Sequence, residues 1–82
     1  MDADRIRASL VESLRAVAPE VGPDELRPDR PLREQVDLDS MDWINFLTGM
    51  KLSLGVDVPE SDYARLTTLD DMIRYVQEVQ AP

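Results

Sequence analysis

The chain has 82 residues, a formal net charge of −8 and a hydrophobic fraction of 43%. It is long enough for one small domain with a single core, and we expect that domain to span residues 1–82. There is no cysteine and no histidine, which excludes disulfides and thiolate chemistry and removes the commonest general base and metal ligand. Catalysis by carboxylates alone stays open, but for a chain of this size and composition we expect a protein that is not an enzyme, with no catalytic residue and no metal site.

The acidic balance also limits the classes of partner. The phosphate backbone of a nucleic acid would be repelled, whereas a basic patch on a partner protein would be attracted. No apolar run approaches the roughly 20 residues of a membrane span, and the first residues lack the basic-then-apolar order of a signal peptide. We expect a monomer in the cytoplasm that binds no nucleic acid and has no membrane span.

The first predicted helix runs from Asp4 to Ala18. Its apolar residues recur at helical spacing, and Pro19 limits its extent. Residues 19–39 follow as a long, proline-rich segment, and unstructured segments of this length are uncommon in compact domains unless they have a function. We expect an ordered loop that could hold a short turn, attached to the core by residues such as Leu32.

Residues 40–54 form the second predicted helix, and Gly55 suits its C-cap. Its apolar residues fall into two sectors when successive residues are placed about 100° apart. The core-facing sector contains Trp43, Phe46, Leu47, Met50 and Leu54. The outer sector contains Met41, Ile44, Thr48 and Leu52. A central helix could bury both sectors, but we favour an exposed outer sector that partner proteins bind.

Two more helices complete the prediction. Residues 60–65 suffice for one or two turns, with Pro59 at the start. The last helix begins at Thr67 or Thr68, because Thr67 and Asp70 have the spacing of a capping box. Nothing alternates with strand period. The predicted fold class is all-α, a four-helix bundle of three longer helices and a short third helix, with a long ordered loop between helices one and two.

Ser40 stands at the predicted start of the second helix, with acidic residues on both sides. The first turn of a helix has backbone N–H groups without intrahelical partners and a partial positive charge. An anionic group attached to Ser40 would therefore be favoured there. The residues alone leave open the commoner role, in which Ser40 or Asp39 is only the N-cap.

Asp39-Ser40-Met41 resembles the Asp-Ser-Leu attachment motif of acyl carrier proteins, with Met in place of Leu. Residues 29–34, 54–60 and 66–69 also resemble the family's segments around this motif, so the similarity covers nearly the whole chain. It implies that Ser40 receives 4′-phosphopantetheine from coenzyme A through a separate phosphopantetheinyl transferase. The thiol of the arm would then hold an acyl group as a thioester for acyl-activating or acyl-transfer enzymes.

The second helix departs from the pattern of fatty-acid-synthesis carriers, which is rich in Glu on the partner-binding side. Asn45, Lys51 and Ser53 stand at comparable positions here. We therefore infer a specialised carrier of a lipid or secondary-metabolite pathway. Its expected partner face consists of Asp42, Ile44, Thr48 and Leu52. The alternative is an unmodified acidic adaptor that binds partners through Met41, Ile44 and Leu52.

Overall fold

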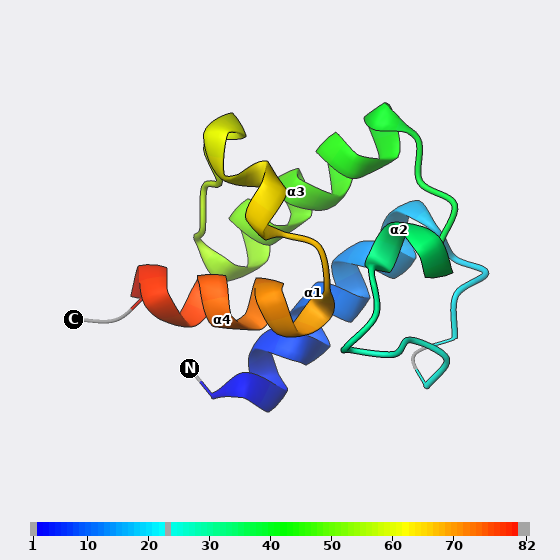
Figure 1. Ribbon diagram of the computed structural model, residues 1–82, viewed down its shortest axis with the longest axis horizontal. Helices are drawn as coiled ribbons and strands as arrows, with labels where there is room; N and C mark the ends of the chain where they lie inside the picture. Colours follow the sequence, from blue (N-terminus) through cyan, green and yellow to red (C-terminus); the bar gives the residue numbers. More distant parts are fainter. Residues whose placement is uncertain (1, 23, 81–82) are drawn as a thin grey trace.

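Helices account for all of the regular structure in the computed structural model, which describes residues 2–22 and 24–80 (Figure 1). The helical segments in chain order are α1 (Ala3–Val17), α2 (Leu32–Gln35), α3 (Ser40–Leu54), the 3-10 helix η1 (Glu60–Arg65) and α4 (Leu69–Gln80). Within the described part of the chain the only β-type pairing is an isolated bridge between Pro31 and Thr68. The predicted all-α class is confirmed. That the whole chain forms one domain stays a prediction.

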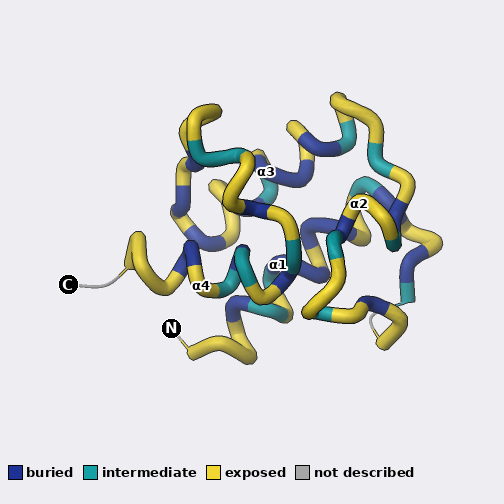
Figure 2. Tube along the Cα trace, viewed as in Figure 1, coloured by how far each residue is buried: buried dark blue, intermediate teal, exposed yellow. Residues whose placement is uncertain are grey.

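The longer helices bury their apolar sides in one core. α1 lies against both α3 and α4, and η1 contacts α4. Figure 2 shows the buried residues on the sides of the helices that face one another. The side chains without any exposed surface include Ile6, Leu10, Leu14, Phe46, Met50, Met72 and Val76. None of the described helices is long and apolar enough to cross a membrane.

α1 begins and ends one residue earlier than predicted, because Asp2 is its N-cap. The Asp2 carboxylate accepts a hydrogen bond from the Arg5 amide at 2.9 Å. Further along, α1 approaches α3 very closely at Gly49. A Cβ placed on Gly49 would lie 3.0 Å from both Cβ and Oγ of Ser13, so the absence of a side chain there allows the two helices to pack at this separation.

The loop between α1 and α3 contains the four-residue helix α2, where only a short turn was expected. The Gln35 side chain holds this segment together: its amide nitrogen donates to the carbonyls of Arg27 and Arg30 at 2.9 and 3.0 Å, and its oxygen accepts from the Arg27 amide at 2.6 Å. Leu32 is buried, and its amide donates to the Thr67 carbonyl at 2.9 Å. The loop is thus ordered and is joined to the segment before α4.

The capping box of α4 lies one residue later than predicted. The Asp71 amide donates to the Thr68 hydroxyl at 3.0 Å, and the Thr68 amide donates to the Asp71 carboxylate at 3.3 Å. The expected Thr67–Asp70 pair does not form, since the Thr67 hydroxyl donates to the Ala64 carbonyl. The bridge between Thr68 and Pro31 fixes the backbone here, and this tertiary contact selects Thr68 as the cap.

We predict that Thr68→Ala lowers the free energy of unfolding by about 1 kcal/mol, because it removes an N-cap oxygen. Thr67→Ala is the matched control and should change the free energy of unfolding by less than about 0.5 kcal/mol. Urea unfolding followed by circular dichroism measures both values. Equal losses for the two variants would contradict the assignment of the cap.

Candidate functional site

The start of α3 is the centre of the candidate site, and Asp39 determines where this helix begins. The Asp39 carboxylate accepts a hydrogen bond from the Asp42 amide at 2.8 Å, and the Asp39 carbonyl accepts from the Trp43 amide at 3.0 Å. Asp39 is therefore the N-cap and Ser40 is the first residue of the helix. Of the two capping residues that the sequence left open, the structure selects Asp39.

Ser40 is exposed at this helix end. Its amide and that of Met41 precede the first intrahelical hydrogen bond, so both point along the helix axis toward solvent. Because Asp39 caps the helix, the Ser40 hydroxyl is not needed for that role. The result is a reachable hydroxyl beside two N–H donors at the positive end of a 15-residue helix. These groups fit a covalently attached phosphodiester, which needs an accessible oxygen and donors for its negative charge.

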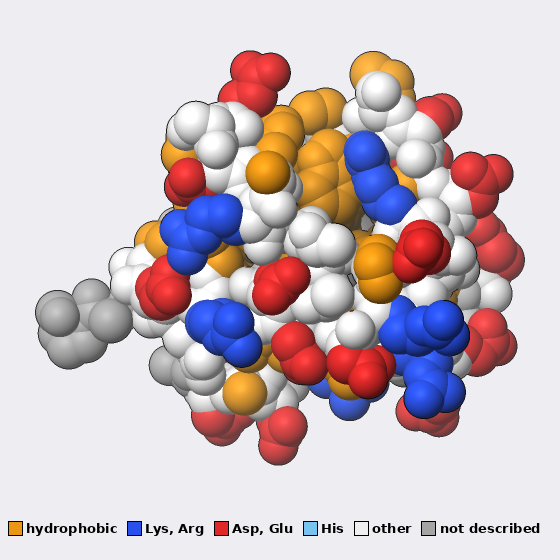
Figure 3. Space-filling model, in the orientation of Figure 1, with side chains coloured by type: hydrophobic (Ala, Val, Ile, Leu, Met, Phe, Trp, Pro, Cys, Tyr) orange, Lys and Arg blue, Asp and Glu red, His pale blue; other side chains and the backbone are white. Residues whose placement is uncertain are grey.

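A hollow of about 510 Å³ begins at Ser40 and extends between α3, η1 and the segments flanking them. Figure 3 shows hydrophobic surface inside a hollow on this face, with a basic side chain beside it. The residues that line the hollow are Pro31, Arg33, Ser40, Trp43, Ile44, Tyr63, Ala64, Leu66 and Thr67. Ser40 is thus placed at a cavity large enough for part of a flexible arm or for a small cargo.

Aromatic side chains form one wall of the hollow. The Trp43 ring lies 5.7 Å from the Phe46 ring and 6.4 Å, edge to face, from the Tyr63 ring, measured between centroids. The Arg33 guanidinium lies over the Trp43 ring, 4.8 Å from its centroid. Trp43 is only 7% exposed, so the ring is packed between these neighbours. The sequence placed Trp43 in the core, but it gave no sign that Arg33 and Tyr63 join it.

The outer sector of α3 lies at the surface, as expected. Met41, Ile44 and Leu52 are 67%, 44% and 82% exposed, and Thr48, also exposed, donates its hydroxyl to the Ile44 carbonyl at 3.0 Å. Asp42 is half-buried beside them. The five residues therefore share a helix that begins at Ser40. That they bind partners stays a prediction.

Fold and site together define a small helical domain with an exposed serine, Ser40, at the start of α3. The sequence model of the family described as "Phosphopantetheine attachment site" matches residues 4–76. Relatives include the meromycolate extension acyl carrier protein of Mycolicibacterium smegmatis, 27% identical over 77 residues, which are 94% of this chain and 77% of the relative. The acyl carrier protein of Rubrobacter xylanophilus is 27% identical over 82 residues, 98% of each chain.

The meromycolate extension acyl carrier protein of Mycobacterium tuberculosis is 26% identical over 77 residues, and the chain spans only 66% of that relative's length. The chain belongs to the phosphopantetheine attachment-site family, as one of its acyl carrier proteins. The predicted family is thereby confirmed. 4′-Phosphopantetheine is the cofactor of this family, and the protein is a non-catalytic carrier.

We predict that Asp39→Ala and Ser40→Ala differ in their effect on stability. Asp39→Ala removes the cap and should lower the free energy of unfolding by about 1 kcal/mol. Ser40→Ala should leave it within about 0.5 kcal/mol, because the hydroxyl does not cap the helix. Chemical denaturation of both variants and the unchanged protein provides the measurement. If Ser40→Ala lowered the free energy of unfolding more than Asp39→Ala does, the Ser40 hydroxyl would be shown to stabilise the fold.

Proposed function

We propose that the protein holds acyl groups as thioesters on a 4′-phosphopantetheine arm attached to Ser40 and presents them to partner enzymes. The proposal rests on one observation above all: Asp39 caps α3, so the neighbouring Ser40 hydroxyl stays exposed at the helix end. The family match covers this position and supports the same assignment. Asp39 and Met41 are the flanking residues of the attachment motif.

Loading requires a separate phosphopantetheinyl transferase. In that reaction the Ser40 oxygen forms a bond to phosphorus, the nucleotide part of coenzyme A leaves, and the hydroxyl proton passes to a base of the transferase. The arm supplies the thiol that holds the acyl group, which the chain cannot supply because it has no cysteine. The chain's own contribution is to expose the oxygen and to stabilise the resulting negative charge with the amides of the first turn.

The partner face of Asp42, Ile44, Thr48 and Leu52 is the proposed docking site for the transferase and for acyl-activating or acyl-transfer enzymes. It offers apolar surface next to Ser40, and apolar contact is what forms the centre of protein interfaces. Met41 adds an adaptable side chain at the same end of the helix. A partner enzyme that binds this face brings its own active site close to Ser40.

A specialised pathway agrees with the charge of α3. Its acidic residue in the first turn is Asp42, and its basic residue, Lys51, lies 3.5 Å from Asp57. Charge steering along this helix is therefore weak, and apolar contacts replace part of it. Relatives named as meromycolate extension carriers suggest a lipid pathway. An unmodified adaptor role is not favoured by the family, and a cytoplasmic location and a monomeric state stay predictions.

Incubation with coenzyme A and a permissive transferase tests the proposal. We expect one phosphopantetheine to be added per chain and Ser40→Ala to abolish the addition, with intact mass as the readout. Ser61→Ala, at another exposed serine, is the matched control and should load normally. A chain that stays unmodified with every competent transferase, or a Ser40→Ala variant that still loads, would refute the assignment.

The partner face is tested by Ile44→Asp. A charge placed in this apolar contact should raise the KM of the transferase about 5- to 30-fold, which corresponds to about 1–2 kcal/mol at an interface residue. Val79→Asp is the matched control, since Val79 is an exposed apolar residue of α4 (52% exposed), and it should alter KM less than twofold. Loading kinetics of both variants decide the matter, and equal values of KM would exclude Ile44 from the contact.

A further inference from the structure

The hollow beside Ser40 has an unusual charge for this protein. Among the residues that the structure describes, Arg33 is the one charged residue that lines the hollow, and no described Asp or Glu lines it, although the chain as a whole contains 17 acidic and nine basic residues. The acidic neighbour in sequence, Asp39, uses its carboxylate to accept the Asp42 amide. The cavity is therefore locally positive in a protein that is otherwise strongly negative.

Arg33 is available to an incoming anion. Among residues 2–22 and 24–80, no carboxylate oxygen lies within 4.0 Å of its guanidinium. The guanidinium carbon lies over the Trp43 ring, 4.8 Å from its centroid, and a cation–π contact of this kind does not use up the N–H donors of an arginine. An oxyanion can thus be bound without breaking an existing ion pair.

The position of Arg33 is fixed from two sides. Trp43, over which the guanidinium lies, packs against Phe46 and Tyr63. The backbone of Arg33 belongs to α2, which is anchored by the buried Leu32 and by the hydrogen bonds of the Gln35 side chain. Such support reduces the entropy that an arginine side chain loses when it binds a ligand.

We propose that Arg33 binds an oxyanion carried by the arm on Ser40. This inference rests on the proposed function and adds a recognition residue to it. Two sources present the same chemistry: the phosphodiester that joins the arm to Ser40, and a carboxylate at the far end of the acyl cargo. In either case Arg33 draws the arm into the hollow, against the ring of Trp43.

The experiment uses the full chain loaded with coenzyme A, butyryl-coenzyme A or succinyl-coenzyme A. Butyryl and succinyl groups have the same number of carbons, and only the succinyl group ends in a carboxylate. Intact mass first establishes loading. Proton–nitrogen spectra of the arginine Nε–H groups are then compared between the apo protein and the three loaded forms, at low and high salt, because screening weakens an exposed ion pair.

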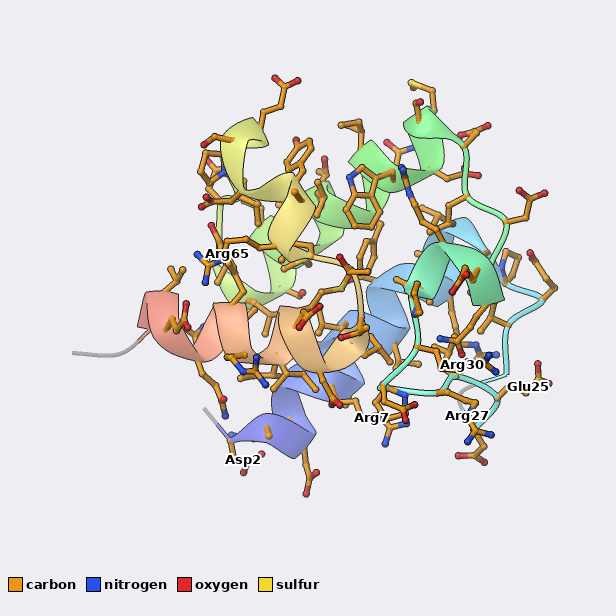
Figure 4. All side chains as sticks on the ribbon, in the orientation of Figure 1. Asp2, Arg7, Glu25, Arg27, Arg30 and Arg65 are labelled. Carbon is orange, nitrogen blue, oxygen red and sulfur yellow. The ribbon has the colours of Figure 1, made fainter. Side chains whose placement is uncertain are left out.

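Arg33→Gln is the test variant and Arg30→Gln the matched control, since both remove one positive charge. Arg30 lies on the loop before α2 and does not line the hollow (Figure 4). Arg33→Gln should reduce the ratio of arms bound in the hollow to arms free in solvent about 1.5- to 5-fold, which is the effect expected for a solvent-exposed ion pair. Arg30→Gln should leave this ratio unchanged.

The outcomes separate the two sources. A shift of the Arg33 signal in all loaded forms, with a phosphorus resonance that moves in Arg33→Gln, supports the phosphodiester. A shift in the succinyl form and not in the butyryl form supports the cargo carboxylate. An Arg33 signal that is the same in apo and loaded protein, or equal effects of the two variants, overturns the proposal. An unchanged mass overturns the proposed function and this inference together, before any spectrum is recorded.

Discussion

The hydrogen bond between the Asp42 amide and the Asp39 carboxylate determines where α3 begins. It makes Asp39 the cap and Ser40 the first helical residue, so two adjacent polar side chains have separate roles. If Ser40 were the cap, its oxygen would be committed to a backbone amide and would not be available to a donor. The chemistry assigned to Ser40 depends on this division. The same helix start also places two free backbone N–H groups beside the oxygen on which the proposed phosphodiester would introduce a negative charge.

Because α3 begins at Ser40, its helical repeat determines which of its residues share the buried sector and which share the outer sector. The sector with Phe46 and Met50 is buried against α1 and the rest of the core, and Gly49 allows α1 to approach closely at Ser13. The outer sector is then necessarily turned away from α1. One helix thus connects the core, the exposed Ser40 and the exposed outer sector, and its packing determines the position of all three.

The bounds of α3 could be predicted because both ends carry local signals. Asp39 caps the first turn, and Gly55 adopts a left-handed backbone with φ of 70° at the C-cap. The predicted capping box of α4 was one residue too early because two threonines are each followed three residues later by an aspartate. Local spacing cannot choose between these pairs. The choice is made by the bridge of Thr68 to Pro31, a contact between segments distant in sequence.

Tertiary contacts also explain what the sequence did not reveal around the site. A helix of four residues has no stability of its own, and α2 exists because the Gln35 side chain bonds to the backbone of the preceding loop. The hollow is assembled from three separate parts of the chain. Ser40 and Trp43 stood out as single residues, whereas Arg33 and Tyr63 could be recognised as part of the site only when the fold places both of them against the indole.

The position of that indole has a practical consequence. The chain contains one tryptophan, and it lines the cavity into which Ser40 opens. Tryptophan fluorescence therefore originates from a single residue that shares this cavity with Ser40, with no background from other indoles. This tryptophan is an intrinsic optical probe of the surroundings of Ser40, and it needs no added dye.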